Sequence, residues 1–125
     1  MVENMAANDY HVIAYQILLY LYDCLKKGID PDDNALNEYR ELHNINIRYW
    51  SRILFDLEKK GYIEYLHIVP LANVEWKIAQ IKSATSITGD GVEYLVDNSL
   101  MQKIKNMGIN AIQGMISTLG GNVVN

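Results

Sequence analysis

The chain has 125 residues, half of them hydrophobic, and a formal net charge of -4. This length fits one domain, and its hydrophobic share supplies a core that needs no disulfide or metal. The single Cys24 excludes an internal disulfide and fits a reducing cytoplasm. Residues 1–9 are too polar for a signal peptide, and the longest apolar run, 12–22, is too short to span a membrane. We therefore expect a soluble, cytoplasmic protein without a membrane partner.

Charge is unevenly distributed along the chain. Residues 1–45 carry 3 basic and 8 acidic side chains, residues 46–82 carry 6 basic and 4 acidic, and residues 83–125 carry 2 basic and 3 acidic. Affinity for nucleic acid comes largely from Lys and Arg that neutralise phosphates. The middle segment is therefore the only one whose charge favours DNA, and the acidic remainder opposes it.

The first predicted helix runs from a cap at Asn8 or Asp9 to Lys27, and Gly28 ends it. One face is apolar at helical spacing: Tyr10, Ile13, Ala14, Ile17, Leu18, Leu21, Cys24 and Leu25. A second apolar line follows another side: Val12, Tyr15, Leu19 and Tyr22. The polar stripe is narrow: Gln16, Tyr20, Asp23 and Lys27. A surface helix needs one apolar face, so either a partner covers the second line or its tyrosines keep their hydroxyls in water.

A cap at Asp30, with Pro31 in the first turn, predicts a second helix to about Leu42. The acidic residues 32–33 favour the positive end of this helix. Together these acids lack the Gly and the closing Glu of a calcium loop, so we interpret them as helix capping. A short turn at residues 43–44 ends the helix.

Asn46 caps a third helix over residues 47–60, and Gly61 ends it. The spacing i, i+3, i+4 and i+7 predicts a buried face: Trp50, Ile53, Leu54 and Leu57. The opposite side holds a different set: Arg48, Arg52, Phe55 and Lys59.

Two strand-like segments follow, 62–69 and 74–81, joined by a turn at Pro70–Asn73. A helix-turn-helix followed by such a hairpin predicts a winged helix, in which the hairpin is the wing. Thr88 caps a further short helix, and the capping box at residues 99–102 starts a last one. The expected fold class is therefore α+β and mostly helical: a winged helix with additional C-terminal helices.

We divide the chain into a winged-helix domain, residues 1–105, and a C-terminal tail, residues 106–125, which has no charged side chain. The tail carries a helical apolar stripe that includes Ile112, Met115 and Ile116, and water disfavours leaving such a stripe bare. It would pack on the first helix or on a second subunit. We expect a homodimer through the first helix and the C-terminal helix, with these partner-binding residues: Tyr15, Leu19, Tyr22, Ile112, Met115 and Ile116.

No residue set indicates catalysis or a cofactor. His11, His43 and His67 are scattered, without a second ligand at a metal-binding spacing. Cys24 lies on an apolar helix face and is expected to pack rather than react. The glycines near residue 90 lack the Lys-Ser/Thr of a phosphate loop. We therefore expect no enzyme activity, no metal, no cofactor and no small-molecule substrate.

Three segments carry a resemblance to a known family: 46–54, 61–63 and 87–103. With them, the chain from about Tyr10 to Met107 resembles YjcQ-type proteins, small winged-helix proteins of bacteria that are often carried by prophages. The Thr-x-x-Gly-x-x-Tyr-Leu piece is widespread among winged helices, and its continuation to Asn98-Ser99-x-Met101 is more particular. The resemblance implies the fold and a phage or prophage setting. It implies no activity and no site residues, and the uncharged tail departs from the Lys-rich helix expected there.

The outer side of the third helix supports two functional hypotheses. In the first, helix 47–60 enters the major groove of double-stranded DNA, as in a prophage-associated transcriptional regulator. Bases and phosphates would be contacted by Arg48, Tyr49, Ser51, Arg52 and Lys59, and the flanking backbone by the wing residues Lys77 and Lys82.

The alternative hypothesis is a protein–protein interaction module of phage origin that does not bind DNA. Phe55 lies in the middle of the outer stripe, where it could touch a thymine methyl or serve as a partner-binding anchor. A third interpretation makes Arg48 and Arg52 a solvated face with Asp56 and Glu58 as local salt partners. Fold alone does not decide between them.

Overall fold

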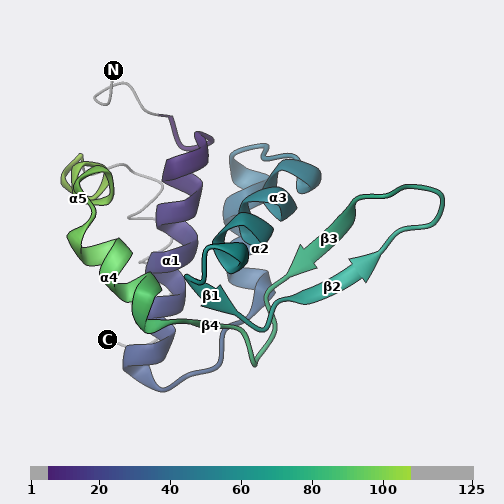
Figure 1. Cartoon of the computed structure of the whole chain (residues 1–125). Helices are drawn as coiled ribbons and strands as arrows, with labels where there is room; N and C mark the ends of the chain where they lie inside the picture. Colours follow the sequence, from purple (N-terminus) through teal and green to yellow (C-terminus); the bar gives the residue numbers. More distant parts are fainter. Residues whose placement is uncertain (1–5, 108–125) are drawn as a thin grey trace.

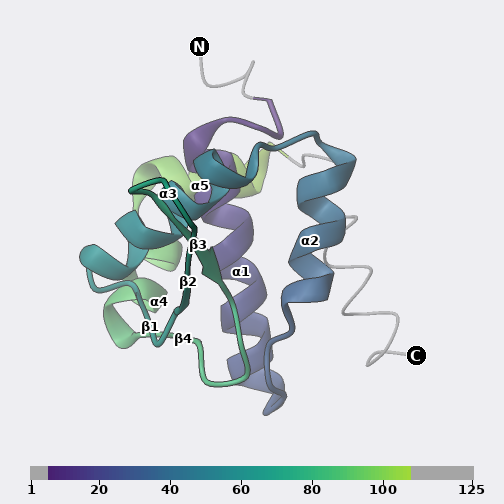
Figure 2. The same cartoon turned by 90° about the vertical axis from the view of Figure 1, so that its right-hand side faces the viewer.

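The structure is a computed structural model that describes residues 6–107. Within this range the chain forms α1 (Tyr10–Lys27), α2 (Asp33–Leu42), α3 (Ile47–Lys59), β1 (Ile63–Glu64), β2 (His67–Pro70), β3 (Lys77–Gln80), β4 (Ser86–Ile87), α4 (Gly89–Asp97) and α5 (Ser99–Asn106). Helix α1 is central, with α2 on one side and α4 and α5 on the other (Figures 1 and 2). The order of elements and the hairpin after α3 are those of a helical winged helix, as predicted.

The strands form two antiparallel ladders, β1 with β4 and β2 with β3. The β2–β3 hairpin is the wing, and it extends away from the helices (Figure 1). Residues 81–85 form the turn that connects β3 to β4, and Thr85 closes this turn with two hydrogen bonds. Its N–H donates to the Lys82 carbonyl (2.9 Å), and its hydroxyl donates to the Tyr65 carbonyl (2.8 Å).

Helix α1 runs over the predicted residues, and it is buried on more sides than its polar stripe suggests. Gln16 and Tyr20, both predicted to be polar surface residues, are 0% and 2% exposed. The prediction is wrong for Tyr20 because α2 begins beside it: the Tyr20 hydroxyl accepts the Asp32 N–H (2.7 Å) and donates to the Asp32 carbonyl (3.1 Å). Leu25, predicted to be inside, is exposed near the end of the helix.

Helix α2 begins later than predicted. Its N-cap is Asp32, whose carboxylate accepts the Asn34 N–H (2.9 Å), and not Asp30. The next residue, Asp33, accepts the N–H of Ile81 at 3.2 Å. Ile81 is buried one residue beyond β3, and a buried backbone N–H needs such a partner. The tie between Asp33 and the end of β3 therefore fixes where α2 starts.

Helix α3 begins at the predicted residue, ends at Lys59, one residue before the predicted end, and has the predicted inner face. The Asn46 side chain caps it by accepting the N–H groups of Arg48 (2.7 Å) and Tyr49 (3.3 Å). The inner residues are all at most 3% exposed: Trp50, Ile53, Leu54 and Leu57. Each buried apolar side chain of this size contributes about 1.5–3 kcal/mol, so this face anchors α3 in the core.

The last two helices pack on α1, and each begins at a capped residue. Thr88 caps α4 as predicted, by accepting the Gly91 N–H at 3.0 Å. A Cβ at Gly91 would lie 2.1 Å from the Tyr62 carbonyl oxygen, so only glycine permits this approach of α4 to β1. The capping box at Ser99 is wrong in its cap: Asn98 caps α5, accepting the Leu100 N–H at 3.0 Å.

Candidate nucleic-acid interface

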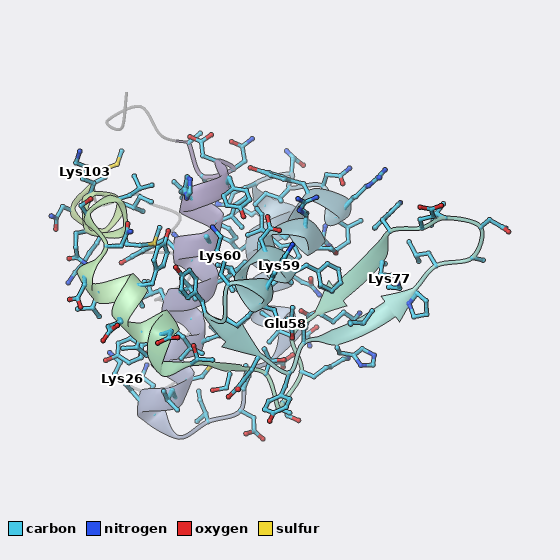
Figure 3. All side chains as sticks on the ribbon, in the orientation of Figure 1. Lys26, Glu58, Lys59, Lys60, Lys77 and Lys103 are labelled. Carbon is cyan, nitrogen blue, oxygen red and sulfur yellow. The ribbon has the colours of Figure 1, made fainter. Side chains whose placement is uncertain are left out.

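The candidate interface is the outer side of α3 together with the adjacent wing. Arg48, Arg52 and Lys59 are exposed there, opposite the inner face that holds α3 in the core. Figure 3 shows Lys59 and Lys60 at the end of α3 and Lys77 on the wing. It also shows Lys26 and Lys103 on the other side of the molecule, on α1 and α5. Lys60 is exposed and was not among the predicted DNA contacts, although its place beside the helix-ending Gly61 indicates an exposed residue.

Arg48 connects the first turn of α3 to the wing just before the start of β3. Its guanidinium carbon lies 5.3 Å from the centre of the Trp76 ring. This is within the range of a cation–π interaction, which orients the cation without neutralising it. The positive charge of Arg48 therefore stays available between α3 and the wing.

Arg52 is part of a chain of contacts that reaches α1. Its Nε donates to Asp56 Oδ1 at 3.0 Å, and the other oxygen of Asp56 accepts the Tyr10 hydroxyl at 2.7 Å. Burial and then the hydrogen bond to Asp56 raise the pKa of Tyr10 to about 12. Burial alone would raise the pKa of Asp56, but the hydrogen bonds from Tyr10 and Arg52 outweigh it and lower that pKa. At neutral pH the carboxylate is ionised and the phenol is protonated, as both hydrogen bonds require.

Two predicted contact residues on α3 are engaged within the protein. Ser51 is 1% exposed, and its hydroxyl oxygen accepts the Ala79 N–H at 3.1 Å. Its assignment to DNA contact is therefore wrong, because α3 and β3 enclose it. Tyr49 is exposed at its ring, and its hydroxyl donates to the Asn8 carbonyl at 3.0 Å. Tyr49 thus joins the start of α3 to the segment before α1.

The remaining residues of the outer stripe are arranged differently from the predicted pattern. Phe55 is half-buried and packs against the core. The Glu58 carboxylate accepts the Leu66 N–H at 3.2 Å and is not an arginine partner. Lys82 lies beyond the end of β3, where it lines a groove with Asp30 and the start of α2. The structure therefore groups Lys77 with α3 and places Lys82 beside acidic residues.

The residues predicted to form the dimer fall into three groups. Tyr15 is 3% exposed, so it is not available to a second subunit, contrary to prediction. Leu19 and Tyr22 are partly buried and pack against the core. The tail residues lie outside the described range: Ile112, Met115 and Ile116.

Other kinds of site are not found in the part of the chain that the structure describes. Among residues 6–107, no three His, Cys, Asp or Glu side chains come together in a way that could hold a metal ion. None of the described helices combines the length and apolar character needed to cross a membrane.

A capped helix pair, α2 and α3, followed by the β2–β3 hairpin defines a winged-helix protein. The family model described as YjcQ protein matches residues 15–113, so the chain belongs to the YjcQ family. No curated protein matches the chain. No solved structure matches it either.

Proposed function

We propose that the protein binds double-stranded DNA through the outer side of α3 and the wing, as a prophage-associated transcriptional regulator. One observation carries the proposal: exposed cations gather on the side of α3 that the core leaves free, and the wing adds one more. They are Arg48, Arg52 and Lys59 on α3, with Lys60 at the C-cap of α3 and Lys77 on the wing. Figure 3 shows the three lysines. The prophage setting comes from the family resemblance. The role is one of binding rather than catalysis.

The dimensions and charges of α3 suit the major groove. Its 13 residues make a rod of about 20 Å, and the groove of B-DNA admits a helix. Two acids lie on α3: Asp56 is paired with Arg52, and Glu58 accepts the Leu66 N–H and keeps its negative charge. Among residues 6–107, no salt bridge involves Arg48, Lys59, Lys60 or Lys77. These four side chains can therefore meet phosphates.

A fluorescence-anisotropy titration of a mixed-sequence duplex at low salt tests the proposal. We expect the wild type to bind, and the double variant Arg48→Ala, Arg52→Ala to bind roughly 10-fold or more weakly, because two cations are lost. The matched control is Lys26→Ala, Lys103→Ala, which removes the same charge from the other side of the molecule. No binding by the wild type, or equal loss in both double variants, would contradict the proposal.

A second candidate function is protein binding through the wing. The residues of its tip, 70–75, include no cation and one acid, Glu75. Exposed apolar side chains lie along the wing from its base to its tip: Tyr65 before β2, Ile68 in β2 and Val74 in the tip are 68%, 46% and 48% exposed. An apolar projection of this kind is typical of a protein contact rather than a phosphate contact. The absence of DNA binding in the titration would favour this alternative.

We also propose a homodimer, made by the outward sides of Leu19 and Tyr22 on α1 with the C-terminal segment of the second chain. A dimer would present two α3 helices to a palindromic site. Light scattering of the full chain should give the dimer mass, and Leu19→Glu should give the monomer mass. A wild-type monomer at the concentrations of the DNA titration would contradict the dimer.

A further inference from the structure

The guanidinium group of Arg52 is held along one edge and free along the other. Its Nε bonds to Asp56, and within the described residues its two terminal nitrogens have no partner. The Arg52 side chain is 76% exposed, whereas Asp56 is 25% exposed. The pair therefore consists of a fixed carboxylate and an arginine whose terminal nitrogens point into solvent.

The carboxylate is fixed from outside α3. A pair four residues apart on one helix is common and weak, and by itself it would imply nothing more. Here the second oxygen of Asp56 accepts the hydroxyl of Tyr10, which comes from α1, 46 positions away in the chain. Because both oxygens are engaged, the Asp56 side chain is held in place, and its bond to Nε holds one edge of the Arg52 guanidinium.

We infer that Arg52 reads a guanine base in the major groove, and that Asp56 and Tyr10 are positioning residues that orient it. Guanine presents O6 and N7 side by side, and arginine meets them with two parallel N–H groups. That geometry needs the two terminal nitrogens free, and a guanidinium held at Nε presents them to the base. A phosphate contact needs only the charge. This assignment rests on the DNA binding proposed above. It adds to that proposal the base that α3 would recognise.

A positioning role also accounts for Asp56, an acid on a surface that would face phosphates. Asp56 lowers the net positive charge of α3, which costs non-specific affinity. In return it would restrict Arg52 to one orientation, so that less conformational entropy is lost when the base is bound. Asp56 would therefore strengthen binding to the specific base relative to binding to any duplex.

The test is a selection of duplexes from a random-sequence pool with the full-length protein, followed by titrations of the selected duplex. Each guanine is replaced in turn by 7-deazaguanine, which keeps base pairing and lacks N7. We expect one position at which this replacement weakens wild-type binding about 10-fold, within the range for a bidentate base contact. Arg52→Lys, which keeps the charge without the planar fork, should lose that sensitivity.

Two further variants separate positioning from charge. Tyr10→Phe and Asp56→Ala should each reduce the guanine preference several-fold while binding to unselected duplex stays equal or becomes tighter. Lys59→Ala should weaken binding to all duplexes alike and keep the preference. Circular dichroism and thermal unfolding verify that each variant is folded. Should Asp56→Ala fail to fold, Tyr10→Phe, which keeps the aromatic ring, carries the test.

Three outcomes would overturn the inference. One is a wild type that binds duplex without any position sensitive to 7-deazaguanine. Another is Arg52→Lys that keeps the sensitivity. The third is Tyr10→Phe and Asp56→Ala that both keep the full preference. A wild type that selects no duplex at all would reject DNA binding itself, and the role of Arg52 with it, which is a distinguishable result.

Discussion

Ser51 shows how one side chain joins α3 to the wing. Its hydroxyl oxygen accepts the N–H of Ala79, and both residues are buried. The N–H of Ala79 faces away from β2, so without Ser51 it would have no partner in the ladder. A buried donor that loses its acceptor costs about 1–3 kcal/mol. Ser51 therefore fixes the wing against α3 rather than contacting a ligand.

Replacing Ser51 by alanine should lower the free energy of unfolding by about 1–3 kcal/mol, because the Ala79 N–H stays buried without an acceptor. Urea unfolding followed by circular dichroism measures the change. Ser83→Ala, at an exposed residue of the turn between β3 and β4, is the control and should change the free energy of unfolding by less than about 0.5 kcal/mol. A Ser51→Ala protein as stable as the wild type would show that this hydrogen bond contributes nothing.

The bond between Tyr10 and Asp56 should make stability depend on pH. The folded protein lowers the pKa of Asp56 below its ordinary 3.8. Stability from this source is therefore present above pH 3.8 and is lost as pH falls through the lower value in the folded state. In Tyr10→Phe one of the hydrogen bonds that lower the pKa is absent. We expect the wild type to exceed this variant in stability by more at about pH 6 than at about pH 3.

Urea unfolding of both proteins at the two pH values tests the prediction. Tyr22→Phe is the control, because Tyr22 lies on α1 away from Asp56, and its effect should be the same at both values. An equal difference between wild type and Tyr10→Phe at the two pH values would mean that Tyr10 does not influence the Asp56 carboxyl.

At the scale of elements, the helix ends show where sequence signals suffice. Asn46 and Gly61 are isolated strong signals, and α3 begins and ends within one residue of the boundaries they predict. Near α2 and α5, two good cap residues lie close together, and local preference does not choose between them. Tertiary contacts do: Asp33 bonds to the end of β3, and the Gln102 amide donates to the Leu95 carbonyl at 3.0 Å.

The start of α5 gives a direct comparison of two neighbouring cap candidates. Asn98→Ala removes the side chain that accepts the Leu100 and Met101 N–H groups, so it should cost about 0.5–2 kcal/mol. Ser99→Ala should change stability by less than about 0.5 kcal/mol, because Ser99 is already inside the helix. Thermal unfolding measures both. A larger loss of stability in Ser99→Ala than in Asn98→Ala would show that Ser99, not Asn98, caps α5.

The sequence predicts which residues of α3 are exposed, but not which contacts they make with other elements. Periodicity predicts the inner face, and the residues opposite follow from it, so the exposed cations Arg48, Arg52 and Lys59 were identified. Periodicity does not relate Tyr10 to Asp56, or Arg48 to Trp76, because these pairs join different elements. The burial of Ser51 was missed for the same reason: β3 covers it, and no pattern within α3 indicates that.

At the scale of the whole molecule, charge separation should orient the protein on DNA. The exposed cations of α3 and the wing lie on one side, while α4 carries Asp90, Glu93 and Asp97. With a net charge of -4, the acidic residues of α4 oppose an approach of DNA to that helix. Such an arrangement steers association, and its effect decreases as salt rises.

The dependence of affinity on salt counts the phosphates that the protein contacts. Arg48, Lys59, Lys60 and Lys77 predict a slope of log K against log salt of roughly -3 to -4 per subunit. Lys77→Ala should make the slope less steep by about 1, and Lys26→Ala should leave it unchanged. Anisotropy titrations over a range of salt concentrations measure the slope. A Lys77→Ala protein with the wild-type slope would remove the wing from the interface.

The most direct measurement of where DNA binds is a titration of the isotope-labelled protein with duplex DNA, followed through its backbone amide NMR signals at low salt. We predict that the signals that shift are those of the outer side of α3 and of Lys77, while those of Asp90, Glu93 and Asp97 stay in place. Unchanged spectra at saturating DNA, or shifts confined to α4 and α5, would contradict DNA binding by α3.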